Sequence, residues 1–154
     1  MNRDADRHHF EDLAVGQTYR STETVTITAE RIKSFAAEFD PQPFHLDEAA
    51  AKTTFFQGLA ASGWHTASVT MRLLVKSDLR PVGGTIGAGG DTLKWPRATR
   101  PGDVLRLEIE VIEARPSQSR PELGIVKLRL TTYNQKDEVV QIATPVLMVP
   151  RRPA

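Results

Sequence analysis

The sequence predicts an α+β fold in which a mostly antiparallel sheet wraps around one central helix. The first observation is an apolar helical pattern from Gly63 to Leu79, whose polar residues form a single stripe at His65, Ser68, Arg72 and Lys76. The second is the change to strand-like alternation in the residues that follow. A helix that is apolar on most sides should be enclosed by other structure, and the following strands can supply that cover. A structural hydrogen bond is the expected role of His65.

The segments before this helix are predicted to form a strand and two short helical elements. The stretch STETVTI is strand-like and ends at Thr28, which is expected to cap a helix. The apolar face of that helix is formed by Ile32, Phe35, Ala36 and Phe39. Pro41 is expected to end the helix, because a residue that precedes proline is pushed out of the α region. Asp47 is expected to cap a second, brief helical turn through EAAAK.

The second half of the chain is predicted to form four or five long strands. VLRLEIEVIEA alternates, with one apolar face formed by Leu105, Leu107, Ile109 and Val111. GIVKLRLTTY alternates again, and EVVQIATPVLMV supplies a last strand, bulged or bent at Pro145. YNQKDE is predicted to form a hairpin turn, and GGDTLKWPRAT to be extended. VGGTIGAGGD is expected to be a flexible loop, because its glycine spacing is not that of a dinucleotide-binding motif.

Length and composition favour a single domain at residues 10–150, preceded by a flexible arm at 1–9 and followed by a tail at 151–154. The 20 Lys and Arg residues against 19 Asp and Glu residues give a net charge of +1, which argues against nucleic acid or a membrane as the main partner. The chain has no cysteine, so disulfides, thiolate chemistry and cysteine-ligated metal sites are excluded. No apolar signal core or membrane-length apolar run is present, and a cytoplasmic protein is expected.

The segment EFDPQPFHLDEAA carries the most informative pair of residues, Asp40 and His45. On an unbroken helix they would point to different sides, but the flanking Pro41 and Pro43 stiffen the backbone and allow a bend that brings them together. A carboxylate beside an imidazole supplies a proton acceptor and a proton donor near neutral pH. The alternative is that Asp40 caps a turn and His45 bonds the backbone. No metal site is expected here, because the usual ligand spacing is absent.

The segment ASGW places Ser62 and Gly63 at the start of the long helix. The first turn of a helix has unpaired backbone N–H groups and a partial positive charge, so a carbonyl oxygen can be bound there as it gains negative charge. Glycine at this point allows a ligand to approach closely. The alternative is that Ser62 is only a helix cap and that Gly63 avoids a clash.

At these residues the sequence resembles the MaoC-like, (R)-specific enoyl-CoA hydratases. DPQPFHLD is similar to the hydratase signature of that family, and ASGWHT to the segment that opens its central helix. FEDLAVGQTY and LKWPRATRPGDVLRLEIEV are similar to two further family segments, so the resemblance covers about residues 10–149. It implies a hot-dog fold, a homodimer, and an acyl-thioester substrate whose pantetheine arm enters a tunnel, often at a subunit interface.

The resemblance also implies roles for individual residues. Asp40 and His45 would be the catalytic pair, and the Gly63 N–H would bind the oxyanion with support from Ser62. Further candidates for contact with the substrate are Gln42, Phe44, Trp64, Lys94 and Arg97. The competing interpretation of the basic residues is a solvated surface. Characterised members commonly have Asn where this chain has Gln42, and this difference bears on the substrate.

The implied reaction is the reversible syn addition of water to a trans-2-enoyl thioester. Coenzyme A enters as part of the substrate, and no separate cofactor is implied. Two alternatives remain open at this point. One is a thioesterase of the same fold, in which an acidic residue activates water against the thioester carbonyl. The other is a non-catalytic module that binds acyl-CoA without turnover.

Overall fold

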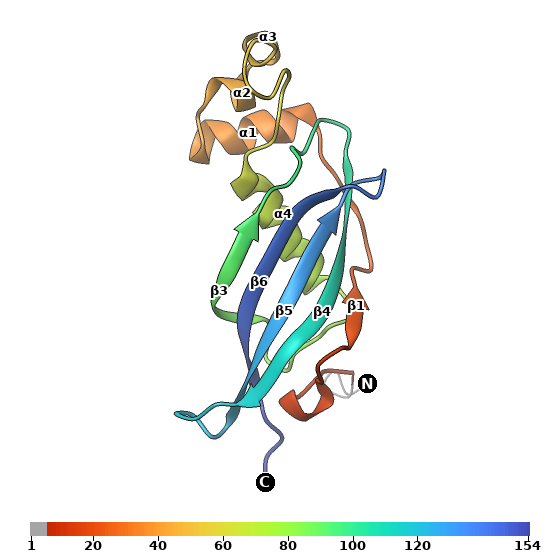
Figure 1. The fold of residues 1–154 in the computed structure, drawn as a ribbon, viewed down its shortest axis with the longest axis vertical. Helices are drawn as coiled ribbons and strands as arrows, with labels where there is room; N and C mark the ends of the chain where they lie inside the picture. Colours follow the sequence, from red (N-terminus) through yellow and green to blue (C-terminus); the bar gives the residue numbers. More distant parts are fainter. Residues whose placement is uncertain (1–5) are drawn as a thin grey trace.

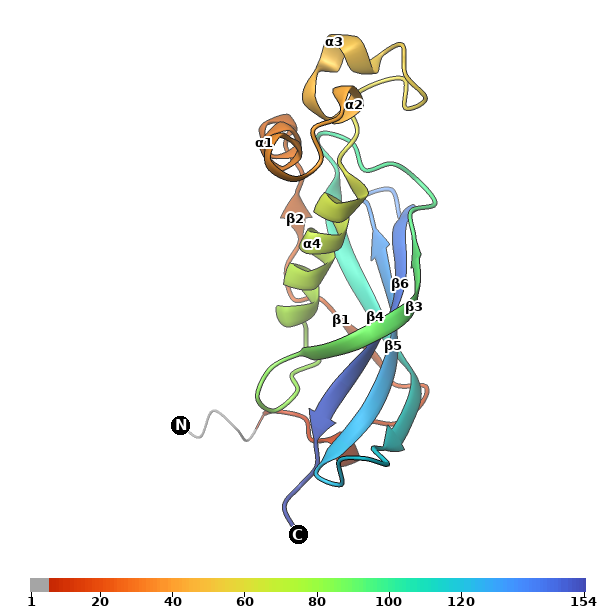
Figure 2. The same cartoon turned by 90° about the vertical axis from the view of Figure 1, so that its left-hand side faces the viewer.

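The computed structural model describes residues 6–154 and contains a six-stranded sheet packed against one long helix, α4 (Gly63–Val75). Figures 1 and 2 show α4 lying along one face of the sheet, which curves partly around it. The predicted α+β class is confirmed. The sheet order is β1-β4-β5-β6-β3, and β2 also pairs with β4. The strands are β1 (Thr18–Arg20), β2 (Val25–Thr26), β3 (Ile86–Lys94), β4 (Val104–Pro116), β5 (Leu123–Tyr133) and β6 (Val139–Pro150).

The long strands β4, β5 and β6 form the centre of the sheet. They pair antiparallel, with Ile109 opposite Leu130 and Leu130 opposite Ala143. The alternation of side chains places one face of each strand against α4. The predicted apolar face of β4 is confirmed, because all four of its members are at most 1% exposed: Leu105, Leu107, Ile109 and Val111. This face and the buried side of α4 form the hydrophobic core.

Helix α4 is buried on one side only, which corrects the prediction that most of its circumference is covered. Val69, Leu73 and Leu74 pack into the core, whereas the opposite side carries Trp64, Met71 and Val75, at 58%, 52% and 56% exposure. The helix also ends earlier than predicted. After Val75 the backbone leaves the helical region, and the hydroxyl of Ser77 donates to the Leu74 carbonyl at 2.7 Å, which satisfies one terminal acceptor.

Three shorter helices gather at one end of the molecule, above the start of α4 (Figure 1). They are α1 (Ala29–Phe39), α2 (Pro43–Leu46) and α3 (Glu48–Ala51). The caps are as predicted: Thr28 accepts from the Arg31 N–H at 3.2 Å, and Asp47 accepts from the first turn of α3. The predicted apolar face of α1 is correct for Ile32 and Ala36, which are fully buried, but Phe39 at its end is exposed.

The glycine-rich stretch expected as a loop lies largely in β3, which corrects that prediction. Gly87 pairs with Leu147 and Gly90 with Pro145 of β6, with register shifts on the β3 side. A Cβ at Gly90 would lie 2.8 Å from the Thr144 carbonyl oxygen, so close approach of two backbones explains glycine there. The bulge or bend that was expected in the last strand at Pro145 is therefore found in β3, in the residues that pair with this part of β6.

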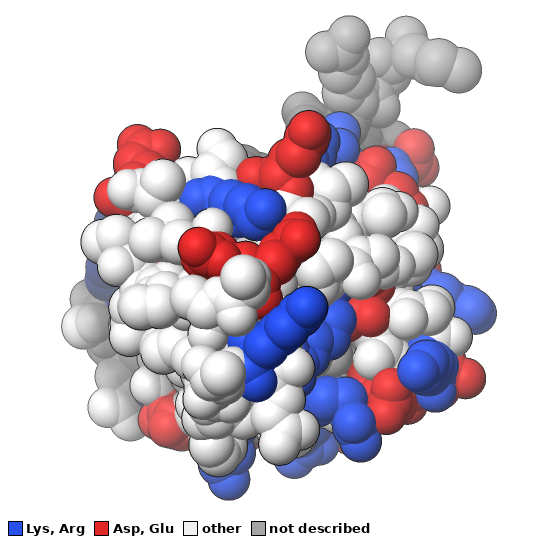
Figure 3. Space-filling model, turned by 90° about the horizontal axis from the view of Figure 1, so that it is seen from above, with Lys and Arg blue, Asp and Glu red and all other residues white. Residues whose placement is uncertain are grey.

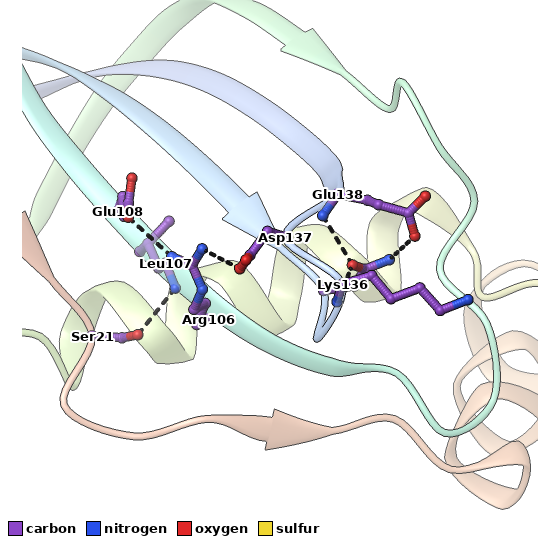
Figure 4. A network of polar contacts seen from close by, with 8 residues as sticks. Ser21, Arg106, Leu107, Glu108, Lys136, Asp137 and Glu138 are labelled. Atoms are coloured by element: carbon purple, nitrogen blue, oxygen red, sulfur yellow. Dashed lines mark hydrogen bonds and ion pairs between the residues drawn. The ribbon is translucent and has the colours of Figure 1, made fainter.

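The predicted hairpin turn joins β5 to β6 and is held by its own side chains. Asn134 Oδ1 accepts from the backbone N–H groups of Lys136 and Glu138 at 2.9 and 3.0 Å. Next to this turn, Arg106 of β4 pairs with Asp137 at 2.8 Å (Figure 4). The turn is thus tied to the neighbouring strand.

Both ends of the described chain contact the domain. Residues 1–5 of the expected arm lie outside the described residues, but the His8 N–H donates to the Arg80 carbonyl at 2.7 Å. In the expected tail, Arg152 pairs with Asp12 at 2.6 Å. Among residues 6–154, no helix has the length and apolar character needed to cross a membrane.

Candidate active site

The structure brings Asp40 and His45 together at the end of α1. The helix stops at Phe39, Asp40 is its C-cap, and His45 lies on the short helix α2, which begins at Pro43. Pro41 therefore ends α1 as the sequence predicted, and Pro43 begins a short helix that was not predicted from the sequence. The Nε2 atom of His45 lies 3.2 Å from the Oδ2 atom of Asp40, and their side chains are 5% and 18% exposed. A nearly buried imidazole faces a carboxylate that retains some access to water.

The orientation of the imidazole is fixed by the loop that precedes α4. His45 Nδ1 lies 2.6 Å from the carbonyl oxygen of Ala60. A carbonyl oxygen can only accept, so Nδ1 carries a proton and donates it. The nitrogen that remains free to exchange a proton is Nε2, the atom that faces Asp40.

The carboxylate of Asp40 is held in its ionised form. Burial by itself acts to raise the pKa of Asp40, but hydrogen bonds from Gln42 and Ser62 and the adjacent His45 outweigh it, so the pKa lies below its ordinary value. The Gln42 amide donates to Asp40 Oδ1 at 2.5 Å. The Gln42 side chain is thus long enough to reach the carboxylate of the residue two positions before it, and this hydrogen bond orders the loop.

The start of α4 lies beside this pair. Ser62 is the N-cap, is fully buried, and accepts from the Trp64 N–H at 3.2 Å. Gly63 is the first helical residue, so its N–H has no acceptor within the helix. Among residues 6–154 no acceptor outside the helix takes up this hydrogen bond either. An unpaired backbone donor is therefore presented at the positive end of α4.

Glycine is required at position 63 by a neighbouring side chain of the same protein. A Cβ built on Gly63 would lie 2.6 Å from Cε2 of Trp95, far inside a normal contact. This agrees with the expectation that Gly63 avoids a clash. The Gly63 N–H nonetheless remains free.

A cavity of about 410 Å³ is lined by His45 and Gly63, whereas Asp40 and Ser62 do not line it. Four aromatic side chains make up much of its wall: Phe44, Phe55, Phe56 and Trp95. An apolar hollow with a few polar groups at one end is typical of a small-molecule site. A larger hollow of about 520 Å³ lies over β1, β4 and β5, but neither Asp40 nor His45 contributes to it.

The candidate substrate contacts divide into two groups. Gln42, Phe44 and Arg97 line the cavity, and Arg97 also pairs with Glu138 at 3.0 Å. Trp64 and Lys94 are exposed and do not line it. On the end that carries α1–α3, acidic and basic side chains are interspersed among uncharged ones (Figure 3). Among the described residues, no group of three or more His, Asp and Glu side chains is placed to hold a metal ion.

Three aromatic residues that line the cavity were not among the site residues expected from the sequence. Phe55 and Phe56 lie in the loop between α3 and α4, and Trp95 follows β3. Arg100 fixes that loop by donating to the carbonyls of Phe56, Gly58 and Leu59 at 2.5, 3.1 and 3.3 Å. Adjacent phenylalanines in a short polar loop were the available signal, because apolar residues outside any periodic pattern often line a site.

His65 differs from its expected role. It is buried on α4, stacks on Phe35 with ring centroids 4.9 Å apart, and its Nδ1 has no partner among the described residues. Instead of the expected structural hydrogen bond, the ring makes a stacking contact with α1, and its Nδ1 is left unpaired among the described residues.

The curved sheet around one long helix defines a hot-dog fold. A protein of Mycobacterium tuberculosis described as having a double hotdogfold matches it with a TM-score of 0.67 at 22% identity, over 96% of this chain and 46% of that one. The site adds an acid–imidazole pair to this fold.

Comparison with known proteins places the chain more narrowly. The family model described as "MaoC like domain" matches residues 10–134. A 3-hydroxybutyryl-CoA dehydratase of Methylorubrum extorquens is 30% identical over 145 residues, covering 94% of this chain and 85% of that protein. A MaoC-like dehydratase structure from Rhodospirillum rubrum is 54% identical, with a TM-score of 0.90 and coverage of 96% and 99%. The R-hydratase PhaJ1 of Pseudomonas aeruginosa is 30% identical, with a TM-score of 0.74 and coverage of 94% and 86%. The chain belongs to the MaoC-like family.

Proposed function

We propose that the protein adds water reversibly to a trans-2-enoyl thioester of coenzyme A and gives a 3-hydroxyacyl thioester. The observation that carries this proposal is the Asp40–His45 pair, 3.2 Å apart, next to a cavity that is lined by His45 and by Gly63, whose N–H is free. Hydration of a conjugated thioester needs these three functions: a base for water, an acid for C2, and a donor for the thioester oxygen.

In the proposed mechanism, a water molecule is held between Asp40 and His45. Asp40 accepts a proton from the water as its oxygen bonds to C3, and the C2=C3 electron pair moves toward the thioester carbonyl. The Gly63 N–H stabilises the resulting negative oxygen. His45 starts the cycle as the imidazolium paired with ionised Asp40, with a proton on both ring nitrogens. Its Nε2 proton then reaches C2, and the electron pair returns to form the C2–H bond. The proton on Asp40 returns to His45, so protons and electrons balance.

The assignment of Asp40 as the base is supported by its surroundings. Its pKa lies below the ordinary value, so the carboxylate is ionised at neutral pH and can accept a proton. The Nδ1 proton of His45 is committed to Ala60, so the proton that the imidazolium gives to C2 is the one on Nε2. The two groups are in contact, so the observed titrations would belong to the pair.

One named relative, a dehydratase of 3-hydroxybutyryl-CoA, supports a thioester substrate, and another, an R-hydratase, supports the hydration reaction. A cavity of about 410 Å³ with aromatic walls suits a short acyl group and the adjoining thioester.

The deciding experiment uses crotonyl-CoA as the probe. Hydration removes the absorbance of the conjugated thioester without releasing a thiol, and this result is expected. Release of free coenzyme A would instead show a thioesterase. Binding of crotonyl-CoA without either change would show a non-catalytic module, and either result would overturn the proposed hydration.

The proposed assembly is a homodimer that covers the outer side of α4 and the free edge of β3. Trp64, Met71 and Val75 form an exposed apolar stripe on the helix, and Ile86 and Leu93 are 45% and 40% exposed on the strand. The strand β3 is the last in the sheet order, so one row of its backbone groups is unpaired. Symmetric pairing of two copies would cover both features at once.

Light scattering on the full chain tests this assembly. Twice the chain mass is expected, and Met71→Glu should shift the protein toward the mass of one chain. A wild-type protein that is monomeric at micromolar concentration would contradict the proposed dimer.

A further inference from the structure

We propose that Trp95 is a substrate-positioning residue whose indole face covers the thioester carbonyl and keeps water away from its hydrogen bond with the Gly63 N–H. This inference rests on the proposed function and adds a residue to that site. It arises from three contacts of Trp95, with Gly63, with Gln141 and with the cavity.

The indole faces Gly63 directly. The Cβ position of Gly63 would lie 2.6, 2.7 and 2.7 Å from three neighbouring ring atoms, Cε2, Cδ2 and Cζ2. Near-equal distances to a ring-fusion atom and two of its three bonded neighbours place the flat face of the ring, and not its edge, over the glycine. Any side chain at position 63 would displace the ring.

The ring is also held in this orientation from the sheet. Trp95 Nε1 donates to Gln141 Oε1 at 2.9 Å, and Gln141 of β6 is only 2% exposed. A buried amide that lost this donor would keep an unpaired acceptor, which is unfavourable. Trp95 is therefore anchored at its pyrrole end, while the indole as a whole is 41% exposed and lines the cavity. An exposed aromatic face with a fixed edge is suited to contact a ligand.

The position of a bound carbonyl follows from these contacts. An oxygen that accepts from the Gly63 N–H lies about 2.9 Å from that nitrogen. Since the indole lies against the same residue, the proposed binding mode places the bound thioester next to the ring face. Removal of water strengthens a hydrogen bond to a developing negative charge, because the local dielectric falls. Trp95 thus shields the hydrogen bond from water, while the Gly63 N–H stabilises the negative charge on the oxygen.

The first test reads the contact directly by fluorescence. The chain contains 2 tryptophans, so Trp64→Phe leaves Trp95 as the sole indole. Butyryl-CoA is the probe, because it has the thioester but no double bond to hydrate. A saturable blue shift of Trp95 emission is expected as the ring is covered, and free coenzyme A at the same concentration should give less change.

Calorimetry with the same protein and probe separates the possible failures. If butyryl-CoA binds and the emission of Trp95 does not change, this inference is wrong and the proposed function stands. If butyryl-CoA does not bind at all, the proposed function and this inference both fail.

The second test is kinetic and uses crotonyl-CoA. Trp95→Ala should lower kcat by about tenfold or more with a change in KM below about threefold, because shielding acts on the charged transition state. Trp95→Phe keeps a ring face without the hydrogen bond to Gln141, and its kcat should lie between those of the wild-type protein and Trp95→Ala. Gln141→Met removes only the hydrogen bond that anchors Trp95 and should also lower kcat. If this variant and the wild-type protein unfold at the same temperature, a purely structural role for Trp95 would not predict that loss.

Wild-type kcat in both folded Trp95→Ala and folded Trp95→Phe would overturn the inference. Asp40→Asn, assayed in parallel, distinguishes this from failure of the proposed function. Inactive Asp40→Asn beside fully active Trp95 variants refutes only the role of Trp95, whereas fully active Asp40→Asn refutes the mechanism itself.

Discussion

The Nδ1 atom of His45 donates to the carbonyl oxygen of Ala60 at 2.6 Å, and this contact decides which ring nitrogen faces Asp40. Ala60 directly precedes the residues that open α4, so the loop that orients the imidazole also leads to the Gly63 N–H. The acid–base pair and the backbone donor are thus positioned by one short segment. The first prediction concerns the pair itself.

Asp40→Asn and His45→Gln should each lower the rate of crotonyl-CoA hydration by about 10²–10⁴-fold. Both replacements keep the approximate shape of the side chain but cannot exchange a proton at neutral pH. Circular dichroism and thermal unfolding check that each variant is folded. Asp47→Asn, which alters only a helix cap, is the matched control and should retain turnover. Hydration at the wild-type rate by either Asp40→Asn or His45→Gln would exclude that residue from the mechanism.

Gln42→Leu should move the acidic limb of the kcat/KM profile to higher pH. The Gln42 amide donates to ionised Asp40, which lowers the pKa of Asp40, so its loss raises that pKa and protonates the base at a higher pH. Gln42→Glu should move the limb further in the same direction, because it also adds a negative charge. Gln42→Asn retains an amide and should move it least. An acidic limb that is identical in all four proteins would contradict the role given to Gln42.

When the pH is lowered from 7.5 to 5.5, the free energy of unfolding should decrease more for the wild-type protein than for His65→Phe. Burial first, and then the charge of Arg31, lower the pKa of His65 in the folded protein below its usual value. The unfolded chain therefore takes up a proton below about pH 6.5 while the folded protein stays neutral, so stability is lost as pH falls. Urea unfolding at the two pH values measures this. Phenylalanine keeps a ring against Phe35, and equal losses in both proteins would refute the prediction.

Gly63→Ala should lower the free energy of unfolding by about 1–3 kcal/mol, because its Cβ overlaps the Trp95 ring. In the Trp95→Ala background the same substitution has room and should cost far less. Urea unfolding of the four proteins forms a double-mutant cycle that measures the coupling. Additive effects would mean that the indole does not lie over Gly63 in solution.

Arg100→Met should destabilise the protein by about 1–3 kcal/mol and expose the loop at 53–62 to proteolysis. The guanidinium donates to the carbonyls of Phe56, Gly58 and Leu59, which lose their partners in this variant. Arg97→Met is the control for stability, since its pair with Glu138 is substantially exposed and should contribute below about 1 kcal/mol. Limited digestion with chymotrypsin, which cleaves after the adjacent phenylalanines, measures how accessible the loop is. Equal cleavage in the two variants would contradict the role of Arg100.

The elements predicted correctly share a local cause. Thr28 and Asp47 cap helices through hydrogen bonds to residues two or three positions away, and Pro41 ends α1 through the conformation of its own neighbour. The alternation of β4 is likewise fixed by the period of a strand. Such features depend on contacts within a few residues, so they can be predicted without the fold.

The features predicted incorrectly depend on contacts between distant segments. The glycine-rich residues of β3 look like a loop until β6 supplies their hydrogen bonds, and Gly90 is needed because Thr144 approaches it. Burial of α4 was overestimated because an apolar pattern does not reveal which of its positions the sheet covers. His65 was expected to make a structural hydrogen bond, yet it stacks on Phe35 of α1 and its Nδ1 has no partner among the described residues.

The sequence by itself determined the fold class, the helix caps, and the spacing that sets Asp40 and His45 around two prolines, because these follow from backbone stereochemistry and local periodicity. Only the tertiary structure decided that Ala60 orients the imidazole, that aromatic rings enclose the cavity, and that Trp95 lies on Gly63. Those contacts join residues far apart along the chain, and their distances are set by the packing of α4 against the sheet.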